Sequence, residues 1–162
     1  MQAPQQIEPT GLADYLEVMT KAVFQSGMSW QVVEAKWGGF REAFAGFDPA
    51  TVAAFTGDDV ERLVEDARII RNRRKIEATI SNAEAMLALD GGTGGFSGWL
   101  RSHDDFEATV AALRGEFRFL GDTGTYFFLY VVGERVPPHE EWMKAHGSTA
   151  HRPSAPRPAR KT

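Results

Sequence analysis

The stretch FRFLGDTGTYFFLYVV, residues 117–132, predicts a glycine turn that leads directly into a buried helix. The run from Tyr126 to Val132 is apolar on every side, so a helix there has to be enclosed by other elements. Before the turn, Phe106, Val110 and Leu113 fall at i, i+4 and i+7, which is one face of a second helix. The sequence therefore predicts a hairpin of two helices.

The turn of this hairpin is a candidate binding site for a phosphate. A helix that starts at a glycine turn points unpaired backbone N–H groups outward. We expect those of Gly121, Thr123 and Gly124 to contact a DNA backbone, as in a helix-hairpin-helix clamp. Asp122 would repel a phosphate, unless it caps the following helix. The alternative, which stays open, is an ordinary helical hairpin within a core.

Composition excludes several classes of protein. The chain has 162 residues and is 43% hydrophobic, which is enough for one folded domain with a core. It has no apolar run near the length of a membrane span and no apolar leader after Met1. It has no cysteine, so disulfides and thiolate metal sites are excluded. We therefore expect a cytoplasmic protein without a membrane partner.

Helical spacing recurs along the rest of the chain. A stripe begins at Leu12, the pair Asp48-Pro49 is a helix start, and a break at 70–72 precedes a long helix. No segment alternates as a strand would, so the sequence predicts an all-α helical bundle. We expect a disordered N-terminus over 1–10, a helical domain over 11–146 and a disordered basic tail over 147–162. The net charge of −4 argues against indiscriminate binding of nucleic acid.

Several segments together carry a resemblance to a known family. They are FQSGMSW at 24–30, FREAF at 40–44, FDPATVA at 47–53, residues 59–76, Asn82-Ala83, residues 117–121 with Thr123 and Tyr126, and Val136 with His139. With these segments the chain resembles the DNA-3-methyladenine glycosylase I family of the helix-hairpin-helix DNA glycosylases. The resemblance implies a base-excision repair enzyme that removes alkylated purines such as 3-methyladenine from double-stranded DNA. It also implies a bacterial protein, nucleoid-associated when bound, which we expect to be a monomer.

The resemblance implies roles for particular residues. Trp30 corresponds to the tryptophan that stacks on the flipped base, and Tyr126 could line the same pocket. Gln25, Gly27 and Met28 lie in the region that wedges into the duplex. Each has an alternative: Trp30 as a core residue, Tyr126 as a buried phenol bonded to a carbonyl, and Met28 as a side chain turned inward.

A group of cations is a second candidate for DNA contact. Arg71, Arg73, Arg74 and Lys75, together with Arg68, lie at a junction between two helices. Phosphate contact would explain them. The alternative is a solvated face whose cations pair with the acids of residues 58–66.

The chain also departs from the family pattern. The base-contacting glutamate of the family is Ala22 here, and the aspartate of the wider superfamily is Pro137. His139 matches one zinc ligand, but Met143 stands where the next would be, so we expect no zinc and no other cofactor. Glu34 and Glu42 could supply a replacement carboxylate, although no pattern favours either.

These departures leave three functions open. A cationic alkylated base is already a good leaving group, so stacking alone could support its removal at a reduced rate. The alternative is a catalytically degenerate relative that recognises damaged DNA without cleaving the glycosidic bond. The third is a helical protein with no role on DNA.

Overall fold

The computed structural model describes residues 3–147, and within this range it contains helices and no strands. This confirms the prediction of an all-α fold. The helices are α1 (Leu12–Gln25), α2 (Trp30–Ala35), α3 (Trp37–Ala43), η1 (Ala45–Phe47), α4 (Pro49–Ala53), α5 (Gly57–Leu63), α6 (Arg73–Asp90), α7 (Gly95–Leu100), α8 (Phe106–Glu116), α9 (Asp122–Val131), α10 (His139–Trp142) and η2 (Met143–Gly147).

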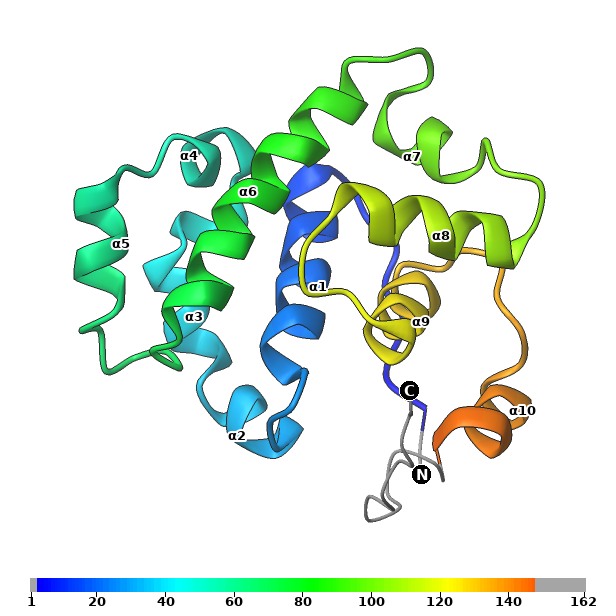
Figure 1. Cartoon of the computed structure of the whole chain (residues 1–162), viewed down its shortest axis with the longest axis horizontal. Helices are drawn as coiled ribbons and strands as arrows, with labels where there is room; N and C mark the ends of the chain where they lie inside the picture. The colour runs from blue at the N-terminus through cyan, green and yellow to red at the C-terminus, as the bar shows by residue number, and fades with distance from the viewer. Residues whose placement is uncertain (1–2, 148–162) are drawn as a thin grey trace, which may run out of the picture.

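Two helices, α1 and α6, form the centre of the fold (Figure 1). Helix α1 packs against α6 and α9, while α6 also packs against α4 and α7. The short helices α2 to α5 lie on one side of this centre, and α7 to α10 lie on the other (Figure 1). Leu16, Met19 and Val23 of α1 are fully buried, as their helical spacing predicted. The two central helices therefore position the helices on both sides of the molecule.

Several helix starts carry a side-chain cap. The Asp48 side chain accepts a hydrogen bond from the Thr51 N–H at 3.0 Å, and Pro49 occupies the first position of α4. Thr56 and Asp59 form a reciprocal capping box at α5. Asn72 caps α6 after the predicted break. The predicted starts of α4 and α6 are confirmed.

The stretch from Trp30 to Phe44 has apolar residues at helical spacing, and the structure divides it at Lys36 into α2 and α3. Helix α3 passes very close to the segment before α6, because a Cβ added at Gly39 would lie 2.5 Å from the Arg68 carbonyl oxygen. The buried Trp37 ring stacks on Phe47 at 5.4 Å and donates its indole N–H to Glu17 at 2.8 Å. Aromatic packing therefore anchors this side of the fold.

The expectation of disorder over residues 1–10 is wrong for part of that segment. The Ile7 N–H donates to the Val131 carbonyl at 2.8 Å, and the Gln6 side chain donates to the Tyr130 carbonyl at 2.9 Å. The last carbonyls of α9 have no partner within the helix, so an extended chain can satisfy them. The basic tail, apart from Gly147, lies outside the described residues. Within 3–147, no helix combines the length and the apolarity needed to cross a bilayer.

Gly39→Ala tests the close approach of α3. The new methyl group would meet the Arg68 backbone, so we expect a loss of about 2 kcal/mol of stability, in the range of other overpacking substitutions. Gly38→Ala is the matched control, because a Cβ there meets nothing within 4 Å. Thermal unfolding followed by circular dichroism measures both. Equal melting temperatures for the two variants would contradict the predicted contact.

Candidate nucleic-acid interface

The turn between α8 and α9 presents free backbone donors. Gly121 is the N-cap residue of α9, and the first bond of the helix runs from the Thr125 N–H to the Gly121 carbonyl at 2.9 Å. The N–H groups of residues 122–124 precede that bond and have no acceptor inside the helix. Gly121 and Thr123 are exposed. The turn can therefore donate several hydrogen bonds to one anion.

Asp122 does not cap α9, which corrects the suggested role. It is the first residue of the helix, and its carboxylate accepts from Arg114 Nη1 at 2.7 Å. Arg114 also donates from Nε to the Leu120 carbonyl at 3.1 Å. The negative charge is thus paired on the hairpin itself, which weakens the objection that Asp122 would repel a phosphate.

Asn82 of α6 holds the loop that precedes α9. The Asn82 side chain accepts from the Arg118 N–H at 2.8 Å and donates to the Arg118 carbonyl at 3.2 Å. Asn82 is almost completely buried. A side chain that satisfies both backbone groups of one loop residue fixes that residue in two directions.

The loop between α1 and α2 carries the predicted wedge. Gly27 has a φ of 72°, a left-handed conformation that glycine adopts without steric cost. Met28 is exposed, whereas Gln25 at the end of α1 is only half-buried. The Met28 side chain is therefore not turned inward, and the loop offers an apolar tip to solvent.

Lys75 supports this loop and does not reach solvent, which corrects its assignment as a phosphate contact. Its Nζ donates to the Phe24 carbonyl at 3.2 Å and to the Ser26 carbonyl. Only 5% of the residue is exposed. Burial lowers the pKa of the Lys75 ammonium, because an ammonium loses hydration in the interior. The cation serves the loop and is unavailable to DNA.

The wedge loop and the hairpin border one hollow of about 590 Å³. Ser26 lines it from the wedge loop, and Phe117, Phe119, Leu120 and Gly121 line it from the hairpin. Helix α8 supplies the rest, with Ala111, Arg114 and Gly115. Two loops far apart in sequence thus meet on one face.

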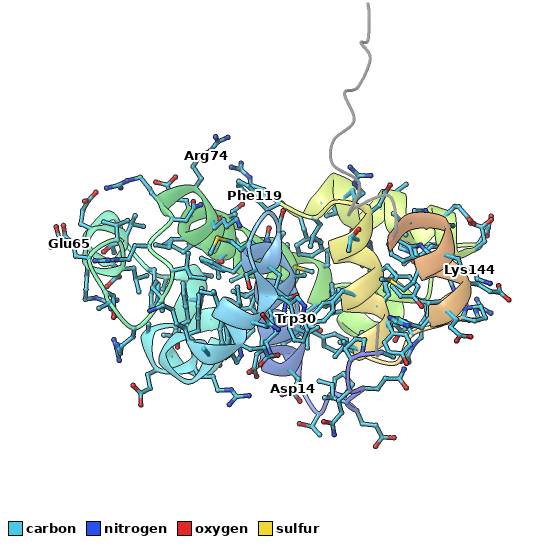
Figure 2. All side chains as sticks on the ribbon, turned by 90° about the horizontal axis from the view of Figure 1, so that it is seen from below. Asp14, Trp30, Glu65, Arg74, Phe119 and Lys144 are labelled. Carbon is cyan, nitrogen blue, oxygen red and sulfur yellow. The ribbon has the colours of Figure 1, made fainter. Side chains whose placement is uncertain are left out.

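Trp30 lies on the surface, at the first position of α2 (Figure 2). It is 51% exposed, so the alternative of a core tryptophan is excluded. It does not line the hollow beside the hairpin. An indole this exposed offers a face on which a flat ring can stack.

The remaining cations differ in their availability. Arg73 makes a bidentate ion pair with Glu61, with N–O distances of 2.8 and 2.9 Å. The pair raises the pKa of the Arg73 guanidinium and lowers the pKa of the Glu61 carboxyl. Arg68 pairs with Asp66 and Glu42. Arg71 and Arg74 are exposed and form no ion pair within residues 3–147. The alternative of a solvated face with ion pairs therefore holds for two of the five cations, Arg68 and Arg73.

Tyr126 is buried, which corrects its assignment to the base pocket. Its hydroxyl donates to the Pro137 carbonyl at 2.7 Å, and its ring stacks on Trp142 at 4.4 Å. Burial raises the pKa of the phenol. Only 3% of the residue is exposed, so no face remains for a base.

The position of the family glutamate is filled by close helix packing. Ala22 is 2% exposed, and a Cβ added at Gly124 would lie 3.7 Å from the Ala22 Cβ. Helices α1 and α9 therefore approach each other through two small residues. Of the suggested replacements, Glu34 pairs with Lys21 at 2.9 Å and Glu42 with Arg68 at 3.2 Å.

The residues of this chain do not fit the zinc site that the family resemblance implies. His139 packs 5.4 Å from the Tyr130 ring, and Met143 stands where a ligand is required. Residues 3–147 contain no cluster of three histidine, aspartate or glutamate side chains placed to hold a metal. Trp142 stacks between Tyr126 and His146 and connects α10 to α9.

Comparison with known proteins identifies the family. The model of the methyladenine glycosylase family matches residues 10–116. The chain belongs to this family. DNA-3-methyladenine glycosylase of Haemophilus influenzae is 32% identical over 130 residues, which cover 67% of this chain and 70% of that protein. The family resemblance expected from the sequence is confirmed.

Two further methyladenine glycosylase relatives differ in how much they match. DNA-3-methyladenine glycosylase 1 of Escherichia coli K12 is 52% identical over 66 residues, but these span only 35% of that protein and 41% of this chain. A crystal structure of a 3-methyladenine DNA glycosylase I variant in complex with 3-methyladenine has a TM-score of 0.70 and 25% identity. The match covers 80% of this chain and 81% of the chain in that crystal structure. The helical arrangement is therefore that of the family.

Three residues of this interface were not found by reasoning from the sequence. Asn82 and Arg114 act on backbone groups of the hairpin loop, and these contacts join segments that no periodic pattern connects. Phe119 was named only within the glycine turn and a segment that carries the family resemblance, and no prediction was made that it is exposed. Its position next to a leucine-glycine turn gave no signal of its direction.

Asn82→Ala tests the support of the hairpin loop. Both backbone groups of Arg118 would lose their partner, so we expect a loss of about 1–3 kcal/mol. Hydrogen exchange at residues 117–121 should accelerate, while Ser81→Ala at the neighbouring half-buried position should leave it unchanged. Unchanged exchange in both variants would show that the loop is held by other contacts.

Lys75→Met tests whether this cation is structural. Two loop carbonyls would be left without a donor, and we expect the melting temperature to fall by roughly 3–10 °C. Arg71→Ala, at an exposed position, should leave the melting temperature unchanged. If Lys75 contacts phosphate instead, its substitution will weaken DNA binding at an unaltered melting temperature.

Proposed function

We propose that this protein is a DNA N-glycosylase of base-excision repair that removes alkylated purines such as 3-methyladenine from double-stranded DNA. The observation that carries the proposal is the placement of the α8–α9 turn and the wedge loop on two sides of one hollow. Membership in the methyladenine glycosylase family supports the reaction class. The names of the Haemophilus and Escherichia relatives support the substrate.

The hairpin would position one DNA strand. The N–H groups at the exposed Gly121 and Thr123 and at the half-buried Gly124 suit a phosphate oxygen, and the α9 dipole adds a favourable field. Within residues 3–147, Arg71 and Arg74 have no ion pair and can contact neighbouring phosphates, whereas Arg73 would first have to break its ion pair with Glu61. These contacts would set the register of the protein on DNA without reading its sequence.

The wedge loop and Trp30 would handle the damaged base. Met28 can fill the space left in the stack, with Gly27 providing the sharp turn and Gln25 standing at its base. The extruded base would stack on the exposed Trp30 indole, where a cationic ring gains both stacking and cation–π attraction.

The chemistry would depend on the leaving group. Water adds to C1′ as the bond to the base nitrogen breaks, the electron pair leaves with the base and neutralises its positive charge, and the added water loses a proton to bulk solvent. A neutral base would need a proton from the protein, but an alkylated cationic base does not. Because Ala22 offers no carboxylate, we expect activity on cationic bases only and at a reduced rate.

A second candidate is a reader of damaged DNA that does not cleave the glycosidic bond. The burial of Ala22 against Gly124 favours it, since no acid can stand at that place. Such a protein would bind duplexes with an alkylated or missing base and release no product.

We further propose a monomer that works in the bacterial cytoplasm and associates with the nucleoid while bound, in line with its bacterial relatives.

One assay separates the two candidates. Methylated duplex DNA is incubated with the protein, and released bases are identified by chromatography. We expect release of 3-methyladenine, lowered by roughly 5- to 100-fold in Trp30→Ala, the range for loss of one stacking contact. Val32→Ala is the control, because Val32 is comparably exposed on the same helix. Binding without release would favour the reader, and neither binding nor release would exclude both.

A further inference from the structure

Phe119 holds a strained backbone conformation that its own burial does not offset. Its φ is 61°, in the left-handed region that L-residues other than glycine, asparagine and aspartate seldom adopt. Such a conformation costs on the order of 1–2 kcal/mol. Phe47 has nearly the same φ of 60°, but its ring is completely buried and contributes core packing. Phe119 is 40% exposed, so the same strain serves to direct a large apolar ring toward solvent.

Arg74, at the start of α6, places a cation next to the Phe119 ring. Its guanidinium carbon lies 5.9 Å from the centre of the Phe119 ring. Both side chains stand on the same edge of the molecule (Figure 2). Arg74 is the second residue of α6, where the helix dipole disfavours a cation. A cation that the local field disfavours and that has no ion pair within residues 3–147 is available to an anionic ligand.

The surroundings of the ring define what could bind there. Phe119 lines the hollow that Ser26 and Gly121 also border, so it stands between the wedge loop and the N–H groups of the hairpin. A flat ring can stack on the phenyl face, while an attached phosphate can reach a guanidinium. An apolar peptide would use the ring but not the cation. A nucleotide of an opened duplex uses both.

We propose that Phe119 and Arg74 form a second stacking site, which takes an unpaired nucleobase of DNA other than the one at Trp30. The inference rests on the proposed function, because extrusion of a base leaves its partner unpaired and its neighbour partly unstacked. Stacking of one of these bases on Phe119 would hold the duplex open. The contact does not depend on sequence, since every base has a π-face.

The test uses a duplex with one tetrahydrofuran abasic site and the fluorescent base 2-aminopurine. In one arm 2-aminopurine stands opposite the abasic site, and in the other it is the neighbour on the same strand. We expect wild-type protein to change the fluorescence in one arm, which identifies the base that Phe119 takes. Phe119→Asn tolerates the left-handed backbone but removes the ring, so it should abolish this change and raise the Kd by roughly 5- to 100-fold.

Matched variants separate stacking from folding. Phe119→Tyr keeps the aromatic face and should bind like wild type, and Arg74→Met should weaken binding and reduce its dependence on salt. The melting temperature of Phe119→Asn should equal or exceed that of wild type. A lower melting temperature with an unchanged Kd would overturn the proposal, as would fluorescence unaffected by the loss of the ring.

The result also distinguishes this inference from the function on which it rests. If wild type and Phe119→Asn release 3-methyladenine equally and bind the duplex equally, the stacking site is wrong and the glycosylase stands. If no base is released but the ring still governs binding, the stacking site stands and the protein is a reader. If wild type binds no duplex at low salt, both proposals fail.

Discussion

Buried hydrogen bonds from one face of α6 hold the two loops on which the interface depends. Lys75 and Asn82 are seven residues apart on this helix, so they project from the same side. Lys75 donates to the carbonyls before the wedge, and Asn82 binds both backbone groups of Arg118. Inside a protein, such polar contacts are costly to break because the abandoned groups cannot reach water. One helix therefore sets the distance between wedge and hairpin.

The sequence predicted the helices well where local chemistry decides them. Asp48 and Pro49 mark the start of α4 through the fixed φ of proline and a capping carboxylate, and both act within a few residues. The division at Lys36 was missed, because it accompanies the approach of α3 to Arg68, a contact between segments distant along the chain. The Ile7 contact with α9 was missed for the same reason.

The candidate site was predictable in its loops but not in its side chains. Gly27 indicates a turn because glycine adopts a left-handed backbone without steric cost, and Gly121 indicates the start of α9 as its N-cap residue. Both turns are present. Whether a given cation or aromatic residue faces water depends on the partner that tertiary structure brings to it. Lys75 and Arg74 are adjacent in sequence, yet one is buried beneath a loop and the other is exposed beside Phe119. No spacing rule separates them.

The contact between Ala22 and Gly124 limits which side chains position 22 can hold. A glutamate at position 22 would enter a space already closed by α9, as an unpaired buried charge, and its energetic cost would be high. A single Ala22→Glu substitution would therefore lower the stability of the fold. Position 22 could hold an acidic side chain only if α9 stood further from α1 than it does here.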